Sequence, residues 1–192
     1  MAYLMGGLLI FLAAHSVQIV AEDWRTRTRA RIGEQAFKGI YSVLSLIGLV
    51  LIVWGFGVAR ETPFLLWLPP TAMRHVAALF NVLAFVLLAA AHVPGNAIQA
   101  RVRHPMVLGV AIWAFAHLVS NGNLAHVVLF GSFLVWAVLD YTSACRRDRA
   151  RGIQYRAGTV GATVLTVLLG GAVAGVFTLW LHGLLIGIKP FG

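Results

Sequence analysis

The segment RVRHPMVLGVAIWAFAHLVSNGN, residues 101–123, decides the fold of this chain. It starts with two arginines and a His-Pro pair, continues as an apolar run that contains His117, and closes on Asn-Gly-Asn. Proline is favoured at the first position of a helix, and Asn-Gly-Asn between two apolar runs is typical of a turn. We therefore expect a helix to begin at Pro105 and a tight turn to separate it from the next apolar run.

The composition of the whole chain predicts a membrane protein. The chain has 192 residues, of which 60% are hydrophobic and 11% charged, whereas soluble domains have roughly 45–50% apolar and about 25% charged residues. We predict an all-α, polytopic membrane protein, a bundle of about six transmembrane helices in one domain, residues 1–192. Apolar windows long enough to cross about 30 Å of hydrocarbon cover residues 2–20, 39–59, 73–93, 105–121, 124–141 and 159–187. The hydrophilic segments between them are too short for a soluble domain with its own core.

The basic residues predict the orientation. Every second connection between the windows is basic. These connections hold 12 of the 15 lysines and arginines and cover residues 21–38, 94–104 and 142–158. The positive-inside rule puts these segments in the cytoplasm and both termini outside it. Arginines next to anionic lipid also account for the net charge of +9, so membrane lipid is the expected partner and nucleic acid is not.

Histidines are the candidate functional residues. A histidine inside a bilayer is costly unless it has a partner, so an intramembrane histidine indicates a site. His15 and His117 lie deepest in apolar runs. With the predicted topology, three histidines (His15, His92 and His104) could meet near the cytoplasm, and four (His75, His117, His126 and His182) near the other face.

Two small-residue patterns accompany these histidines. Trp113 precedes His117 by one helical turn and Gly109 precedes Trp113 by another, which predicts an open surface beside a flat aromatic ring, suited to a planar ligand. In the last apolar window, Gly171 and Gly175 form a Gly-x-x-x-Gly pattern that favours close packing of helices.

The chain resembles the NnrU family, bacterial inner-membrane proteins named from gene clusters for nitrite and nitric oxide reduction. The resemblance rests on RHPMVLGVAIWAFAHLVSNGN at 103–123, IGEQAFKGIYSVLSLIGLVLIVWGFG at 32–57, the early His15-Ser16 pair and LHGLLIG at 181–187. It implies an inner-membrane location, a link to denitrification, and a nitrogen-oxide reductase or another respiratory component as partner.

The family is similar in turn to plant 15-cis-zeta-carotene isomerase, a membrane enzyme that uses b-type haem. The similar residues are Arg103, His104, Pro105, Gly109, Trp113, His117, Gly122 and Asn123, together with the early histidine. This similarity implies haem b with His15 and His117 as iron ligands, and Trp113, Arg103 and His104 as further cofactor-binding residues. It also implies redox or isomerase chemistry. The plant block has a cysteine three residues before its second histidine, where this chain has Ala114, so a switch to thiolate ligation is not expected.

The predicted depths of the two histidines leave other pairings open. His15 and His117 lie near opposite ends of their windows, which separates them by roughly 15 Å in depth at 1.5 Å per residue, whereas two imidazoles on one iron need Cα atoms roughly 12–13 Å apart. The pair requires a flat haem, tilted helices or shifted boundaries. Otherwise His15 pairs with His92 or His104, and His117 with His126 or His182.

Two other classes of function remain as alternatives. Membrane methyltransferases that bind S-adenosylmethionine resemble the Arg103-His104-Pro105…Gly109 opening, but they follow it with a Glu-rich element, and CRRDRARGIQYRAG at 145–158 contains no Glu. The remaining alternative is a non-catalytic assembly or partner factor for a respiratory reductase, which needs no deep histidines.

Overall fold

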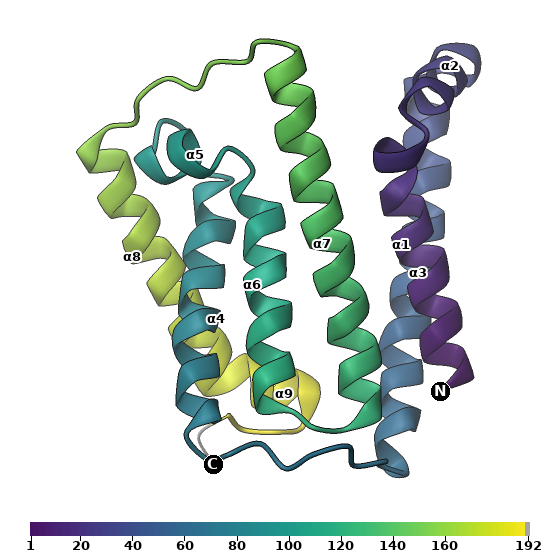
Figure 1. Ribbon diagram of the computed structural model, residues 1–192, viewed down its shortest axis with the longest axis vertical. Coiled ribbons are helices and arrows are strands. Elements are labelled where there is room, and N and C mark those ends of the chain that lie inside the picture. Colours follow the sequence, from purple (N-terminus) through teal and green to yellow (C-terminus); the bar gives the residue numbers. More distant parts are fainter. Residues whose placement is uncertain (191–192) are drawn as a thin grey trace.

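The computed structural model describes residues 1–190, and they form a helical bundle (Figure 1). Five helices are long and apolar enough to cross a membrane, and a sixth apolar helix is shorter. The elements are α1 (Ala2–Val20), α2 (Glu22–Ile32), α3 (Glu34–Glu61), α4 (Met73–Ala90), α5 (Ala97–Val102), α6 (Pro105–Ser120), α7 (Leu124–Ala150), α8 (Val160–Val176), the π-helical η1 (Phe177–Leu181) and α9 (His182–Ile186). The predicted all-α membrane bundle is confirmed, as is the turn at 121–123.

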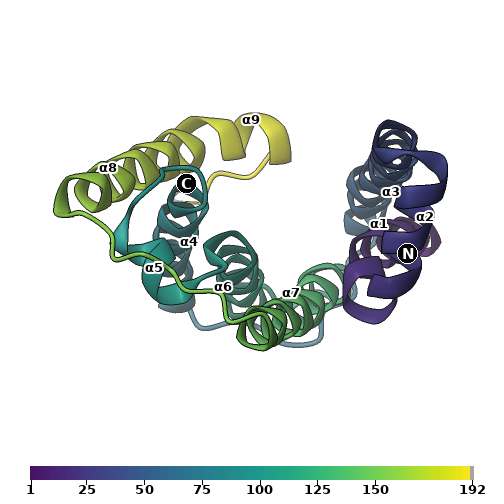
Figure 2. The ribbon, with the colours of Figure 1, turned by 90° about the horizontal axis from the view of Figure 1, so that it is seen from above.

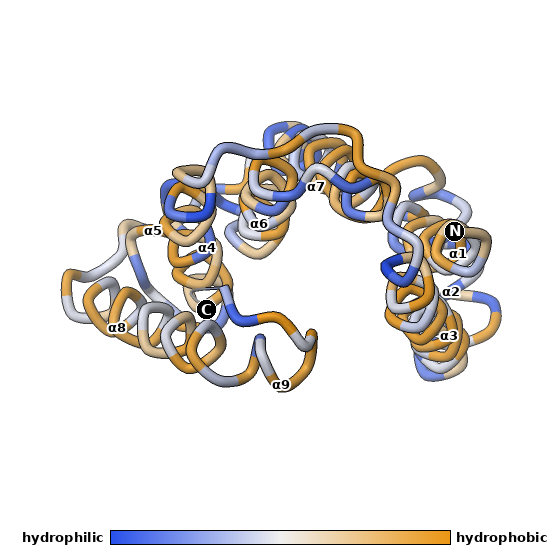
Figure 3. The backbone as a smooth tube through the Cα atoms, turned by 90° about the horizontal axis from the view of Figure 1, so that it is seen from below, coloured by the Kyte–Doolittle hydropathy of each residue, from blue (hydrophilic) through white to orange (hydrophobic). Residues whose placement is uncertain are grey.

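The spanning helices form an open arc. Each packs on the next in the order α3, α1, α7, α6, α4 and α8, and Figure 2 shows the arc from above. Only 17–22% of the residues in the five long spans are buried, and the tube in Figure 3 is largely apolar along the spans. Most of the helix surface is therefore left for lipid, which agrees with lipid as a partner.

The two ends of the bundle differ in charge. One end, called here the basic end, carries α2, α5 and the segment 151–159 (Figure 1). The other, called the terminal end, carries Met1, the loop 62–72, the turn 121–123 and α9. The predicted windows match the spanning helices, but the connection 94–104 contains the short helix α5, and two further connections are also partly helical.

The first of these is segment 21–38, which contains α2 and the start of α3. The helix α2 reads EDWRTRTRARI and buries none of its residues, so it has no apolar stripe for a sequence pattern to detect. Acidic residues in its first turn and arginines in its last turn suit the helix dipole. The second is α7, which runs nine residues beyond the predicted end at 141, to Ala150.

Glycines let α1 and α3 approach closely. A Cβ atom on Gly7 would lie 2.6 Å from the backbone nitrogen of Ile52, and one on Gly48 would lie 2.8 Å from the nitrogen of Phe11. Neither distance leaves room for a side chain. The pattern predicted for the last window is wrong in its residues: Gly171 and Gly175 have no neighbour there, whereas Gly170 lies against Val86 of α4. Which glycine faces a neighbour depends on the rotation of the helix, which the spacing alone does not give.

Backbone contacts fix the terminal-end loop. The backbone nitrogen of Leu66 donates to the carbonyl of Gly122 at 2.8 Å, and that of Leu124 donates to Phe64 at 2.9 Å. A Cβ on Gly122 would overlap the carbonyl of Trp67. Gly122 of the Asn-Gly-Asn turn is therefore required by the loop that lies on it.

Candidate functional site

His15 lies on α1 near the basic end, with its ring held among aromatic side chains. The ring stacks on Phe11 with centroids 4.1 Å apart and lies 5.1 Å from Tyr41 and 6.0 Å from Trp136. Its Nδ1 is 2.7 Å from the Phe11 carbonyl. A carbonyl only accepts, so Nδ1 carries the proton and Nε2 keeps its lone pair. Metal-ligating histidines commonly use such a bond to a carbonyl to fix the ring and its tautomer.

A cavity of about 310 Å³ opens beside His15. Its walls come from α1, α2 and α3, and its lining residues are Ala14, His15, Val17, Gln18, Arg25, Arg29, Phe37, Lys38 and Tyr41. Arg29 and Lys38 each lie 2.8 Å from a carboxylate oxygen of Glu34, and the guanidinium of Arg25 lies 5.9 Å from the Phe37 ring centre. Three cations with one neighbouring carboxylate make this cavity electropositive, which suits an anionic group.

His117 lies in the last turn of α6, near the terminal end. Its Nδ1 is 2.8 Å from the carbonyl of Trp113, which again leaves Nε2 as the basic nitrogen. The ring stacks on Phe130 at 4.4 Å and lies 5.2 Å from the ring of Trp113. The predicted neighbourhood of Trp113 and His117 is therefore present.

The open surface expected beside Trp113 is absent. A Cβ on Gly109 would lie 3.0 Å from the carbonyl oxygen of Ala84, so α4 covers this face of α6. Trp113 itself packs edge-on against Phe130 and Phe133, with centroids 5.0 and 5.7 Å away. Gly109 serves helix packing, and Trp113 is half-buried and packs against the core.

The structure does not bring His15 and His117 to one position. Helices α1 and α6 both pack on α7 and make no close backbone contact with each other within residues 1–190. An aromatic row separates the two imidazoles: Phe11, which stacks on His15, lies 5.8 Å from Phe133, and Phe133 lies 5.7 Å from Trp113. His15 also lies near the end of α1 that precedes α2, at the basic end, and His117 near the end of α6 that precedes the turn 121–123, at the terminal end. One iron bound by both does not fit this arrangement.

Arg103 and His104 lie at the basic end, in a separate polar cluster. His104 Nε2 is 2.7 Å from Oδ2 of Asp148, and the hydroxyl of Tyr155 donates to the same oxygen at 2.7 Å. Burial and the carboxylate of Asp148 raise the pKa of Tyr155 to about 12, so its hydroxyl stays protonated at physiological pH. Arg103 has φ +66°, the left-handed region, just before the His-Pro start of α6. Such a conformation costs about 1–3 kcal/mol outside glycine, and the surrounding contacts must hold it.

Comparison with protein families decides where the chain belongs. The family described as "NnrU protein" matches residues 3–190, nearly the whole chain. The chain belongs to the NnrU family. No curated protein and no solved structure matches it. The family match covers all of the candidate residues, from His15 to Tyr155.

The other histidines of this NnrU protein do not gather into a metal centre. His92 is exposed and its Nδ1 lies 2.9 Å from the Leu88 carbonyl, while His182 Nδ1 lies 2.6 Å from that of Ile188. His126 and His117 both flank Phe130. Within residues 1–190, no group of three His, Cys, Asp or Glu side chains could hold a metal ion.

Sequence reasoning missed Asp148 and Tyr155. Both belong to the segment after the fifth apolar window, for which only the basic residues and the absence of glutamate were considered. Because α7 continues to Ala150, Asp148 lies beside His104 at the start of α6, 44 residues earlier in the chain. No local pattern signals this pairing.

Proposed function

We propose that this NnrU protein binds b-type haem in the basic-end cavity, with His15 as an iron ligand. The observation that carries the proposal is His15 itself: its Nδ1 is fixed by the Phe11 carbonyl, and the residue lines an electropositive cavity. Neutral imidazole is a common axial ligand of haem iron. The aromatic rings of Phe11 and Tyr41 around it suit a flat, apolar macrocycle.

The charges of the cavity support the same ligand. Haem combines an apolar ring with two propionates, and Arg25, Arg29 and Lys38 would face these carboxylates at the membrane surface. Glu34 already pairs with Arg29 and Lys38, so a propionate would compete with Glu34 for these cations. His117 is too far along the aromatic row to share the iron, and its Nε2 would serve a different ligand at the terminal end.

The role that follows is redox chemistry in nitrogen-oxide metabolism at the bacterial inner membrane. Haem supplies one-electron transfer and an iron that binds small ligands. With the basic end toward the cytoplasm, His15 would lie near that face and both termini in the periplasm. A nitrite or nitric oxide reductase is the proposed partner, and isomerisation of a lipophilic substrate is the alternative reaction for the same cofactor.

The test is an absorption spectrum of the detergent-purified protein, oxidised and reduced, after expression with ample haem. We expect a Soret band in the wild type and in His92→Ala, and loss of the band in His15→Ala. His92 is the matched control because its Nδ1 also bonds the carbonyl four residues earlier while its side chain is exposed. A colourless wild type would contradict the proposal and favour a non-catalytic partner of a reductase.

A further inference from the structure

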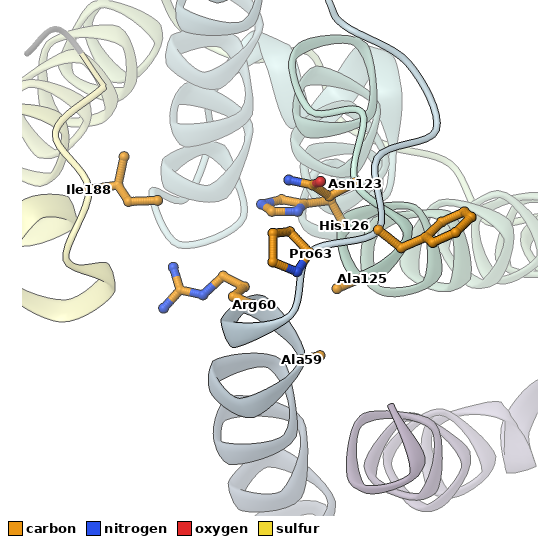
Figure 4. A pocket seen from close by; sticks show the side chains of 8 residues that line it. Ala59, Arg60, Pro63, Asn123, Ala125, His126 and Ile188 are labelled. Atoms are coloured by element: carbon orange, nitrogen blue, oxygen red, sulfur yellow. The ribbon is translucent and has the colours of Figure 1, made fainter.

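A second cavity, of about 270 Å³, lies at the terminal end and is independent of the haem proposal. Figure 4 shows side chains from the end of α3, the loop 62–72, the start of α7 and the segment after α9 around it. The lining residues are Ala59, Arg60, Pro63, Phe64, Asn123, Ala125, His126 and Ile188. Four segments far apart in the sequence therefore meet around one small space.

Arg60 brings a positive charge to this cavity, and no carboxylate of residues 1–190 forms an ion pair with it. Its Nη1 donates to the carbonyl of Ile186 at 3.2 Å, and its guanidinium lies 5.0 Å from the ring centre of Phe56. Its Nε is enclosed and has no hydrogen-bond partner. None of the ion pairs formed within residues 1–190 involves Arg60.

His126 contributes a second nitrogen without a partner. Its Nδ1 is enclosed and makes no hydrogen bond, while its ring is held 5.1 Å from Phe56 and 6.1 Å from Phe130. An enclosed polar atom without a partner costs about 1–3 kcal/mol. Arg60 and His126 therefore bring a guanidinium and an imidazole, each with one unpaired nitrogen, to the lining of the same cavity.

The start of α7 adds donors to the same place. The 27-residue helix begins at Leu124, and its N-cap residue Asn123 makes no side-chain hydrogen bond to it. The nitrogen of Leu124 donates to the Phe64 carbonyl, but the next N–H groups of a first turn have no partner inside the helix. The positive end of the helix dipole therefore lies at a cavity that Asn123 and Ala125 already line.

We propose that the terminal-end cavity binds an oxyanion, a carboxylate or a similarly small anion with acceptor oxygens. The lining offers a guanidinium, an imidazole and a helix N-terminus but no carboxylate, so it favours anions over metal cations. The oxyanion belongs either to a free small anion or to the headgroup of a lipid that reaches the end of α3.

The test is a calorimetric titration of the full chain in neutral detergent with sodium formate and, separately, with sodium phosphate. We expect saturable binding of at least one of them to the wild type. Replacing a charged donor removes about 1.5–3 kcal/mol, so affinity should fall by about tenfold or more in Arg60→Gln. His126→Phe, which keeps the packing on Phe56, should weaken binding by a smaller factor. Arg74→Gln is the matched control: Arg74 lies in the first turn of α4, next to the loop 62–72, is exposed and does not line the cavity.

Detergent and nanodiscs then identify the source of the oxyanion. The reference is the binding of formate or phosphate in a neutral detergent without phosphate. Weaker binding in nanodiscs of phosphatidylcholine, whose headgroup carries a phosphodiester but no net charge, would assign the cavity to a lipid headgroup, and equal binding would assign it to a free anion. The proposal is overturned if neither probe binds the wild type in any of these environments, or if Arg60→Gln and His126→Phe bind as tightly as Arg74→Gln.

Discussion

Asn96 joins three segments at the basic end. Its side chain is 1% exposed; its Nδ2 donates to the carbonyls of Ala90 and Val93, and its Oδ1 accepts from the nitrogen of Gln99. It thus closes the last turn of α4 and caps α5. A buried amide with both of its polar atoms bonded is a strong local constraint, because each partner left without it would be unpaired.

The first prediction follows from these bonds. Asn96→Ala should lower the free energy of unfolding in mixed micelles by about 2–3 kcal/mol, because buried carbonyls and the N–H of Gln99 lose their partners. Asn81→Ala is the control, since Asn81 makes one bond within its own helix, to Ala77, and alanine is the better helix former. Equal losses in the two variants would contradict this role of Asn96.

His15 and His117 are alike at the residue scale and differ in their surroundings. Both bond the carbonyl four residues earlier through Nδ1, as does His92. Only His15 also lines a cavity with Arg25, Arg29 and Lys38. The bond fixes the tautomer, and the cavity makes His15 the better candidate ligand.

The helix pair α1–α3 depends on close backbone approach. A Cβ on Gly55 would overlap the backbone of Leu4, whereas one on Gly57, half a turn later, would meet nothing within 4 Å. Overpacking costs typically 1–3 kcal/mol, while glycine inside a helix is about 1 kcal/mol worse than alanine. Alanine at these two positions of α3 should therefore change the free energy of unfolding in opposite directions.

The second prediction is that Gly55→Ala lowers the free energy of unfolding by about 1–3 kcal/mol and that Gly57→Ala leaves it unchanged or raises it by up to about 1 kcal/mol. Thermal unfolding of both variants in the same detergent measures the difference. A stability of Gly55→Ala equal to that of Gly57→Ala would show that α1 and α3 do not approach as closely as described.

At the scale of elements, apolar length and turn chemistry predicted most of the fold. The window 2–20 matches α1, and the Asn-Gly-Asn turn separates α6 from α7 as expected. The charged helix α2 was missed because it has no apolar face to detect. The end of α7 was placed too early because the chain leaves the apolar window before the helix stops.

The candidate site was less predictable than the fold. The position of each histidine along its helix follows from the windows: His15 lies near the end of α1 before α2, and His117 near the end of α6 before the turn 121–123. The neighbours of each histidine could not be predicted, because they depend on how each helix is rotated about its axis and on the position of α7 between α1 and α6. Gly109 shows the same limit: the sequence left its face open, and the fold covers it with α4.

The helices form an open arc that starts at α3 and ends at α8 and α9, and one hydrogen bond links these two arms at the terminal end. Helices α3 and α8 make no close contact within residues 1–190, yet Arg60 at the end of α3 bonds the carbonyl of Ile186 in α9. At the basic end, Arg151, just after α7, pairs with Glu22 of α2. The two cavities described above lie at opposite ends of the arc, and the one near His15 is lined by α1, α2 and α3.

The third prediction concerns the orientation of this arc. Cys145 is the only cysteine of the chain, so single cysteines can be placed in a Cys145→Ala background. A membrane-impermeant maleimide should label Thr71→Cys, in the terminal-end loop, in intact spheroplasts. Arg156→Cys, at the basic end, should react only after lysis, because the positive-inside rule keeps that end in the cytoplasm. The reverse labelling would contradict the orientation.

The most direct test of the central claim is the haem content per chain of the purified wild type, His15→Ala and His117→Ala, measured by the pyridine haemochrome method. The account predicts about one haem per chain in the wild type and in His117→Ala, and almost none in His15→Ala, because one histidine at one cavity holds the iron. Loss of haem from both variants would contradict it, since a shared iron would require α1 and α6 to meet where α7 now separates them.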